Sequence, residues 1–167
     1  MKFKLAFVAA ALSLTAASGV SAQTINLGVS ATVGAACVLA QTAIGFGVYN
    51  PAAIVALNAT GNLSLSCTTG STPNIAIGQG LNFSGGTRRM ASGTGFLNYS
   101  VFQPVSNAAG AACAFVTAYP AVNPGFTLTA APSTAARIYN VCGQIPAGQT
   151  TVTAGNYSDT VIASIAF

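Results

Sequence analysis

Apolar and small polar residues alternate along residues 24–33 with the period of an extended chain. One face of this segment carries the apolar residues Ile25, Leu27, Val29, Ala31 and Val33. The other face carries only threonine, asparagine, glycine and serine. A period of two residues is typical of a β-strand that lays one face against an apolar surface. The pattern therefore predicts an amphipathic strand near the beginning of the chain.

The same alternation returns in short segments along the rest of the chain. It is found in residues 62–68 and 97–102, around Phe126 and Tyr139, and again in residues 157–167. Turns that contain glycine or proline separate these segments. No stretch shows a sustained apolar period of 3.6 residues, which a helix would need. Short strands at this spacing predict an all-β sandwich or barrel.

The first 22 residues have the features of a secretory signal peptide. Lys2 and Lys4 precede an apolar run over residues 5–17, and Val20-Ser21-Ala22 fits the small-x-small pattern of a cleavage site. The apolar run is shorter than the roughly twenty residues that a membrane-spanning helix needs. We therefore expect export with cleavage after residue 22, rather than retention by an anchor.

The remaining chain has very few charged side chains, and this limits its chemistry. Only Arg88, Arg89, Arg137 and Asp159 carry charge, so three cations and one anion give a net charge of +2. So few cations cannot form the basic surface that binds nucleic acid. With no histidine and a single acid, the chain also cannot assemble a carboxylate pair or a Ser-His-Asp relay. We expect no enzymatic activity, no cofactor and no small-molecule substrate.

Four cysteines, in a chain that we expect to be exported, indicate two disulfide bonds. They contain no C-x-x-C pair, and no histidine could complete a metal site, so a metal centre is the weaker interpretation. Four cysteines allow three pairings. The nearly equal separations within the chain favour Cys37 with Cys67 and Cys113 with Cys142. Each bridge would stabilise the fold by about 3–4 kcal/mol through the unfolded state.

A few single residues allow more local expectations. Arg88 and Arg89 follow two glycines, so we expect them to be solvated loop charges. Asp159 follows a Gly-Asn turn, and we expect its carboxylate to satisfy nearby backbone groups. Phe46 and Tyr49 are expected to pack at the core and at the edge of a sheet.

The last segment also raises an alternative architecture. A terminal strand that ends in an aromatic residue, Phe167, is typical of a small outer-membrane β-barrel. However, the chain has no tryptophan and only five tyrosines, which are too few for two aromatic girdles. Seven prolines and four cysteines suit a sandwich better. We therefore expect a sandwich and keep the barrel protein as the alternative.

Five motifs give the chain a resemblance to the spore coat protein U domain family, over residues 23–167. They occur in the order of that family: IGFGVYNP (44–51), RRM (88–90), LNYSVF (97–102), YNVCGQIPAGQ (139–149) and GNYSDTV (155–161). This family comprises pilin subunits of Csu-type, or archaic, chaperone-usher pili. The second cysteine pair, Cys113 and Cys142, departs from many members, so its pairing rests on chemistry alone.

The resemblance implies an incomplete immunoglobulin-like β-sandwich that lacks its last strand. Two partners would fill the gap in succession. A periplasmic chaperone would do so first, and at the outer-membrane usher the N-terminal extension of the next subunit would replace it. On this interpretation residues 1–22 are the signal peptide, residues 23–36 a donor-strand extension and residues 37–167 the pilin domain. The donor side chains would be those of the alternating apolar face of residues 24–33. The acceptor groove would be lined by Val161, Ala163, Ile165 and Phe167.

The expected function follows from the same resemblance. The chain would be a structural subunit of a surface pilus of a Gram-negative bacterium, assembled with neighbouring pilin subunits by donor-strand exchange and supporting adhesion and biofilm formation. An unpaired sheet edge is an aggregation hazard, and an added strand satisfies both its backbone groups and its pockets. The competing interpretation is that residues 24–33 form an ordinary first strand of their own domain.

Overall fold

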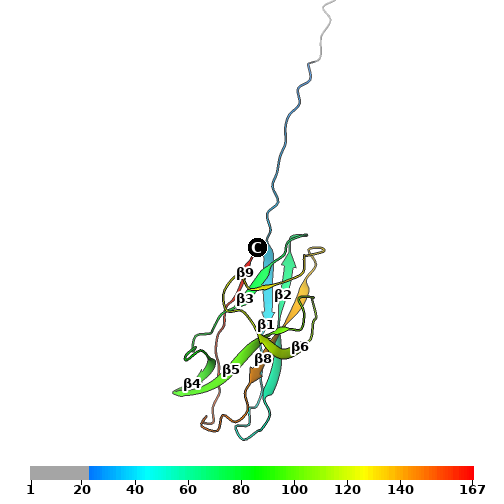
Figure 1. Cartoon of the computed structure of the whole chain (residues 1–167). Helices are drawn as coiled ribbons and strands as arrows, with labels where there is room; N and C mark the ends of the chain where they lie inside the picture. Colours follow the sequence, from blue (N-terminus) through cyan, green and yellow to red (C-terminus); the bar gives the residue numbers. More distant parts are fainter. Residues whose placement is uncertain (1–22) are drawn as a thin grey trace, which may run out of the picture. The chain divides into compact units, whose positions relative to one another are not determined.

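The computed structural model describes residues 23–167, so the predicted signal peptide lies outside the described residues. Residues 33–167 form one compact unit of β-strands and loops, and residues 23–32 belong to a separate unit. In this part of the chain no helix is long and apolar enough to cross a membrane. The strands, labelled in Figure 1, are β1 (Cys37–Thr42), β2 (Leu57–Cys67), β3 (Asn74–Ile77), β4 (Arg88–Ser92), β5 (Gly95–Pro104), β6 (Cys113–Ala118), β7 (Phe126–Thr127), β8 (Arg137–Ile145) and β9 (Ala163–Ala166).

The strands form two antiparallel sheets that pack as a sandwich (Figure 1). The larger sheet has the order β1-β2-β8-β5-β4, with β6 also paired to β5, and the smaller sheet has the order β7-β3-β9. The run β1-β2-β8-β5 matches the A-B-E-D sheet of an immunoglobulin domain, and β3-β9 matches strands C and F. The last strand, G, would pair with β9, but among the described residues β9 is an outer strand. The predicted incomplete immunoglobulin-like sandwich is confirmed.

The core is built from the alternating strands that the sequence predicts. In β2 the residues Leu63, Leu65 and Cys67 are buried, while the residues between them are only partly covered. The same alternation places one face of β5 and of β8 in the core, and β3 closes it from the other sheet. The largest fully buried side chains of these strands are Tyr139, Leu65, Ile75, Ile145 and Val101.

Both predicted disulfide bonds are present. Cys37 and Cys67 lie opposite each other in the β1–β2 ladder and are joined there. Cys113 and Cys142 join β6 to β8, next to the centre of the larger sheet. The described residues contain no free cysteine. The sequential pairing, which near-equal spacing favoured, is confirmed.

The terminal segment is less regular than its alternation predicts. Instead of one strand over residues 157–167, it contains an isolated bridge between Ser158 and Ala91, and then the short strand β9. Between these two points no backbone ladder is formed, because the segment passes from β4 of the larger sheet to β3 of the smaller sheet. Residues 24–33 also form no strand in the described chain.

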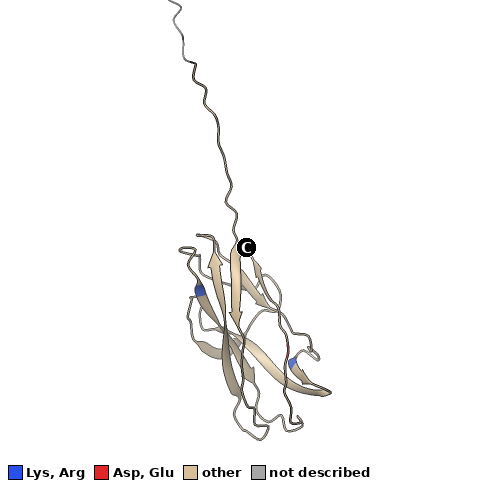
Figure 2. Cartoon of the chain, turned by 180° about the vertical axis from the view of Figure 1, so that it is seen from behind, with Lys and Arg blue, Asp and Glu red and all other residues tan. Residues whose placement is uncertain are grey.

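The interpretation of Arg88 and Arg89 as loop charges was wrong, because both lie in β4 and are partly buried. The Arg88 guanidinium donates to the carbonyl oxygens of Ile77, at 2.6 Å, and Gly78, at 3.0 Å. Arg89 donates to the carbonyl oxygen of Asn82, at 2.9 Å. The carbonyls of Ile77 and Gly78 lie at the end of β3, and that of Asn82 lies in the connection to β4. Figure 2 shows how few positions of the described chain carry a charged side chain.

Candidate acceptor groove between two sheet edges

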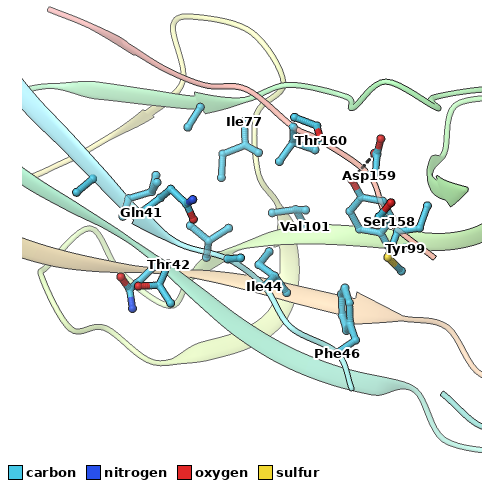
Figure 3. A pocket seen from close by; sticks show the side chains of 18 of the residues that line it. Gln41, Thr42, Ile44, Phe46, Ile77, Tyr99, Val101, Ser158, Asp159 and Thr160 are labelled. Carbon is cyan, nitrogen blue, oxygen red and sulfur yellow. Dashed lines mark hydrogen bonds between the residues drawn. The ribbon is translucent and has the colours of Figure 1, made fainter. Parts of the chain in front are cut away.

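An open cavity of about 610 Å³ lies between β1 and the C-terminal segment. Figure 3 shows Ile44, Ile77 and Val101 directed into the space that these two segments border. Most of the lining is apolar. The lining residues are Leu39, Ala40, Gln41, Thr42, Ala43, Ile44, Phe46, Asn62, Leu63, Ile77, Met90, Tyr99, Val101, Val141, Tyr157, Ser158, Asp159, Thr160, Val161 and Ala163.

Within residues 23–167, both walls of the groove are sheet edges with no strand bonded on the groove side. On one side, β1 is bonded only to β2, so half of its backbone N–H and C=O groups face the groove. On the other side, β9 is bonded only to β3. β9 ends at the end of the sandwich where β1 begins, so the two strands run in opposite directions (Figure 1). A single extended chain in the groove could therefore bond to both edges, antiparallel to one and parallel to the other.

Two glycines shape the floor of the groove. A Cβ atom on Gly61 would lie 2.6 Å from the carbonyl oxygen of Thr42, and one on Gly143 would lie 2.6 Å from Cγ2 of Ile44. Their absence lets the chain after β1 cross closely over β2 and β8. Phe46, carried by this crossing, meets Tyr99 edge to face with ring centroids 6.3 Å apart. The floor is thus an apolar layer of Ile44 and Phe46 laid on the larger sheet.

Tyr49 fixes the far end of this crossing segment. Its hydroxyl donates to the carbonyl oxygen of Pro146, at 2.9 Å, and accepts from the backbone N–H of Gln149, at 3.0 Å. Gln149 in turn bonds through its side chain to both backbone groups of Asn98 in β5. The F-G-x-Y and I-P-x-G-Q motifs are therefore partners in space, and together they hold the floor of the groove.

The carboxylate of Asp159 anchors the C-terminal wall. Oδ2 accepts from the Tyr99 hydroxyl at 2.7 Å, a bond that Figure 3 shows as a dashed line. Oδ1 accepts from the backbone N–H of Leu81, at 3.0 Å, and from the side-chain amide of Asn82, at 3.1 Å. Gly80 has a φ of +89°, and a Cβ atom there would overlap Oδ2. The carboxylate therefore joins three separate elements, and one of its contacts satisfies a backbone group as expected.

Burial of this polar cluster changes the acidity of its members. Burial raises the pKa of the Tyr99 phenol above its usual range, and the hydrogen bond to Asp159 raises it further. Burial also lowers the pKa of Arg88 below its usual value, an effect that nearby Tyr99 and Asp159 partly oppose. Tyr99 therefore stays a protonated donor, and the cluster works as a fixed structural anchor.

Backbone bonds complete the attachment of the C-terminal wall. Ala91 and Ser158 exchange two N–H to carbonyl bonds, at 2.8 and 3.1 Å. The N–H of Gly78 donates to the carbonyl oxygen of Ile162 at 2.8 Å. Between these points residues 159–161 have no backbone bond to either sheet. This stretch keeps its backbone free beside the groove.

The predicted groove residues divide into two groups. Val161 and Ala163 line the cavity. Ile165 lies opposite Ile75 in the smaller sheet and packs against the core, and Phe167 is 58% exposed. The sequence predicted only the C-terminal wall of the groove, because alternation relates residues within a single segment. The opposite wall comes from the far end of the domain sequence, and the IGFGVYNP motif was the only sequence signal for it.

The apolar face of residues 24–33 has no partner in the described chain. Ile25 is 94% exposed, Leu27 87%, Val29 89% and Val33 83%, and Ala31 is exposed as well. Solvent exposure of four large apolar side chains in one short segment is unfavourable, by roughly 1.5–3 kcal/mol for each one relative to full burial. A surface that covers this face would therefore gain much of its affinity from these side chains.

Side chains that could bind a metal ion do not gather in the described part of the chain. Within residues 23–167 no group of three or more histidine, cysteine, aspartate or glutamate side chains is placed to hold a metal ion. The one carboxylate is occupied by the three hydrogen bonds of the anchor. What the groove presents is two sheet edges and an apolar floor.

The fold and the groove define an immunoglobulin-like sandwich that is open where its last strand would lie. The model of the Spore Coat Protein U domain matches residues 23–164, and the chain belongs to this family. It is 36% identical over 186 residues to "Protein U" of Myxococcus xanthus, an alignment that covers 100% of this chain and 98% of that protein.

A solved structure shows the same fold. It is a chain of the CsuC–CsuE chaperone-tip adhesion subunit pre-assembly complex, from the archaic chaperone-usher Csu pili of Acinetobacter baumannii. The TM-score is 0.56 at 23% sequence identity. The match covers 81% of this chain and 40% of that chain, so the present chain spans less than half of its length.

Proposed function

We propose that this protein is a structural, non-enzymatic subunit of a chaperone-usher surface pilus and polymerises by donor-strand exchange. Residues 24–33 of one copy would enter the groove of the next copy as its missing strand. The observation that carries this proposal is the pair of unpaired edges, β1 and β9, on either side of one apolar groove. The same chain supplies an exposed segment with the alternation that such a groove accepts.

The energetics favour a stable polymer. An inserted strand would satisfy free backbone groups of both edges and bury one apolar face. Each large donor side chain would contribute about 1–3 kcal/mol when buried, with Ala31 below that range. The sum is large before the costs of association are subtracted. Dissociation of such a joint is therefore expected to be very slow.

The remaining partners follow from family membership and from the pilus complex with the same fold. Before assembly, a periplasmic chaperone would cover the groove, and an outer-membrane usher would mediate the exchange. This route places the subunit on the surface of a Gram-negative cell, after removal of residues 1–22. Residues 23–36 would then be the donor extension and residues 37–167 the receiving domain. The fibre would serve adhesion and biofilm formation.

Deletion of residues 24–33 tests the proposal. The truncated subunit should fold in the presence of its chaperone, because the segment contributes no strand to its own sandwich. It should form no SDS-resistant ladder by itself, and a synthetic peptide of residues 23–34 should bind its groove and raise its melting temperature. A matched peptide with Leu27 and Val29 changed to serine should not do so. A truncated protein that still assembles, or that never folds with chaperone, would contradict the proposal.

A further inference from the structure

The point where the N-terminal segment leaves the domain is held by a small set of contacts around Thr68. The Thr68 N–H donates to the carbonyl oxygen of Ala36 at 2.8 Å, and the Ala36 N–H donates to Oγ1 of Thr68 at 3.2 Å. The Thr68 hydroxyl also lies 3.3 Å from the carbonyl oxygen of Gly34. Directly beside them, the Cys37–Cys67 disulfide closes the end of the β1–β2 ladder. These contacts, named here the exit clamp, extend the line of β1 back to Gly34.

The exit clamp affects the competition between insertion of the donor segment into its own groove and insertion into the groove of another copy. If residues 24–33 are a donor strand, each subunit carries a ligand for its own groove, tethered next to one of its walls. A short flexible tether gives an effective concentration of about a millimolar, well above the concentration of free subunits. Without a restraint, the segment would turn back as a hairpin along the free edge of β1 and fill its own groove.

Hairpin register shows how the exit clamp limits such self-insertion. If residues 34–36 stay bonded to Thr68, the turn can come no later than residues 31–33. A three-residue turn there pairs Ile25 with Leu39 and Gln23 with Gln41, which lie on the groove face of β1. The segment then ends before it reaches Ile44 and Phe46, which line the rest of the groove.

Release of the exit clamp removes this limit. A three-residue turn over residues 34–36 would pair Val29 with Gln41 and Leu27 with Ala43. The donor face would then cover the β1 side of the groove as far as Ile44. A shift of the turn by three residues thus separates a short, incomplete self-contact from full occupation of the groove.

We propose that Thr68, together with the Cys37–Cys67 disulfide, is a positioning element that directs the donor segment to a second copy of this chain. It acts through the backbone of residues 34–36 and does not touch the groove itself. The inference rests on the proposed function. It adds that the choice between self-insertion and polymerisation is set at the exit of the segment.

Thr68→Val tests this inference, because valine keeps the shape and the backbone N–H but loses the hydroxyl. Thr69→Val is the matched control, since Thr69 is exposed and its side chain makes no hydrogen bond within the described residues. The full chain would be exported, refolded at micromolar concentration with its disulfides oxidised, and divided into monomer and polymer. Hydrogen exchange of the peptide covering residues 24–33 would then be measured in the monomer fraction.

For Thr68→Val we expect the monomer-to-polymer ratio to rise about fivefold, the factor that one net hydrogen bond supports. Residues 24–33 should become more protected from exchange in that monomer than in the wild-type and Thr69→Val monomers, where self-contact stays incomplete. A purely structural role of Thr68 would lower stability without protecting this peptide, and that result overturns the inference. So does equal behaviour of the two variants. The proposed function is tested separately by the deletion of residues 24–33. It fails if the truncated chain still forms polymers.

Discussion

Two segments of this chain carry the same alternation of apolar and polar residues, yet only one belongs to the sandwich. Residues 157–166 bridge to β4, pair with β3 as β9, and place Val161 and Ala163 against the groove. Residues 24–33 form no strand in the described chain, and their large apolar side chains are more than four-fifths exposed. The comparison shows that alternation marks a segment as a strand without saying whose sheet receives it.

The difference between the segments lies in their anchors. The C-terminal segment carries Asp159, whose carboxylate accepts three hydrogen bonds from β5 and from the β3–β4 connection. Backbone bonds at Ser158 and Ile162 hold it on either side. The N-terminal segment has no charged residue and no cysteine, and the contacts of Thr68 begin only at Gly34. A segment without such anchors forms no strand in the described chain, whatever its alternation.

A charge on the apolar face of the N-terminal segment should have the largest effect. Val29→Asp would carry an unpaired carboxylate into an apolar groove, at a cost on the order of several kcal/mol. We expect the yield of SDS-resistant polymer to fall by at least about a hundredfold, since each 1.4 kcal/mol is a factor of ten. Ser30→Asp, on the opposite face, is the control and should assemble nearly normally. Equal loss in both variants would show that the two faces are equivalent.

A bulky side chain in the wall of the groove should prevent the subunit from accepting a donor strand. Ala163→Trp would fill space that an inserted strand needs, while the N-terminal segment of the same subunit stays intact. Mixed with wild type, this variant should donate but not accept, and should therefore shorten polymers by capping one end. Ile162→Trp is the control, because Ile162 is 72% exposed. Electron microscopy of fibre lengths measures the effect, and unchanged lengths with Ala163→Trp would contradict it.

Removal of the Asp159 carboxylate should weaken the attachment of the C-terminal segment to the sandwich. Asp159→Ala loses three hydrogen bonds to a charged acceptor and leaves the Tyr99 hydroxyl without its partner. We expect the free energy of unfolding to fall by about 2–4 kcal/mol, from the usual contribution of charged hydrogen bonds. Urea denaturation of the chaperone-free monomer measures this, with Asn156→Ala as an exposed control. If Asp159→Ala lowers the free energy of unfolding by less than Asn156→Ala does, the backbone bonds alone hold the C-terminal segment.

The smallest expected effect is a pH dependence of the same anchor. The pKa of Tyr99 is raised in the folded state, so its contribution to stability is complete below the unfolded pKa of about 10 and is lost as the pH rises above it. Wild type should therefore lose stability between about pH 10 and pH 12.

Tyr99→Phe should lose less of its stability over this interval. Part of the loss should remain in the variant, because burial also raises the pKa of Tyr119. Thermal melts at several pH values compare the two slopes. Parallel slopes for the two proteins would show that Tyr99 carries no part of the alkaline transition.

Parts of the groove could be predicted from sequence, and parts could not. Val161 and Ala163 line the cavity, and the sequence could group them because alternation places them on one face of a single segment. Leu39, Ile44 and Phe46 were not assigned to the groove, because nothing local connects them to the C-terminal segment. Arg88 and Arg89 were misplaced for a similar reason. Two preceding glycines suggest a loop, but the carbonyls of Ile77, Gly78 and Asn82, which need donors, are near them only in the folded chain.

By itself, the sequence determined the local preferences of this protein. Period-two alternation specified β-strands, the cysteine spacing favoured the disulfides that the fold contains, and ordered motifs indicated the family. Only the tertiary structure decided that β1 and β9 each keep a free edge on one groove, and that residues 24–33 pair with neither. The physical reason is that a strand's side-chain pattern is local, whereas its hydrogen-bond partners are distant in sequence and are chosen by the packing of the whole domain.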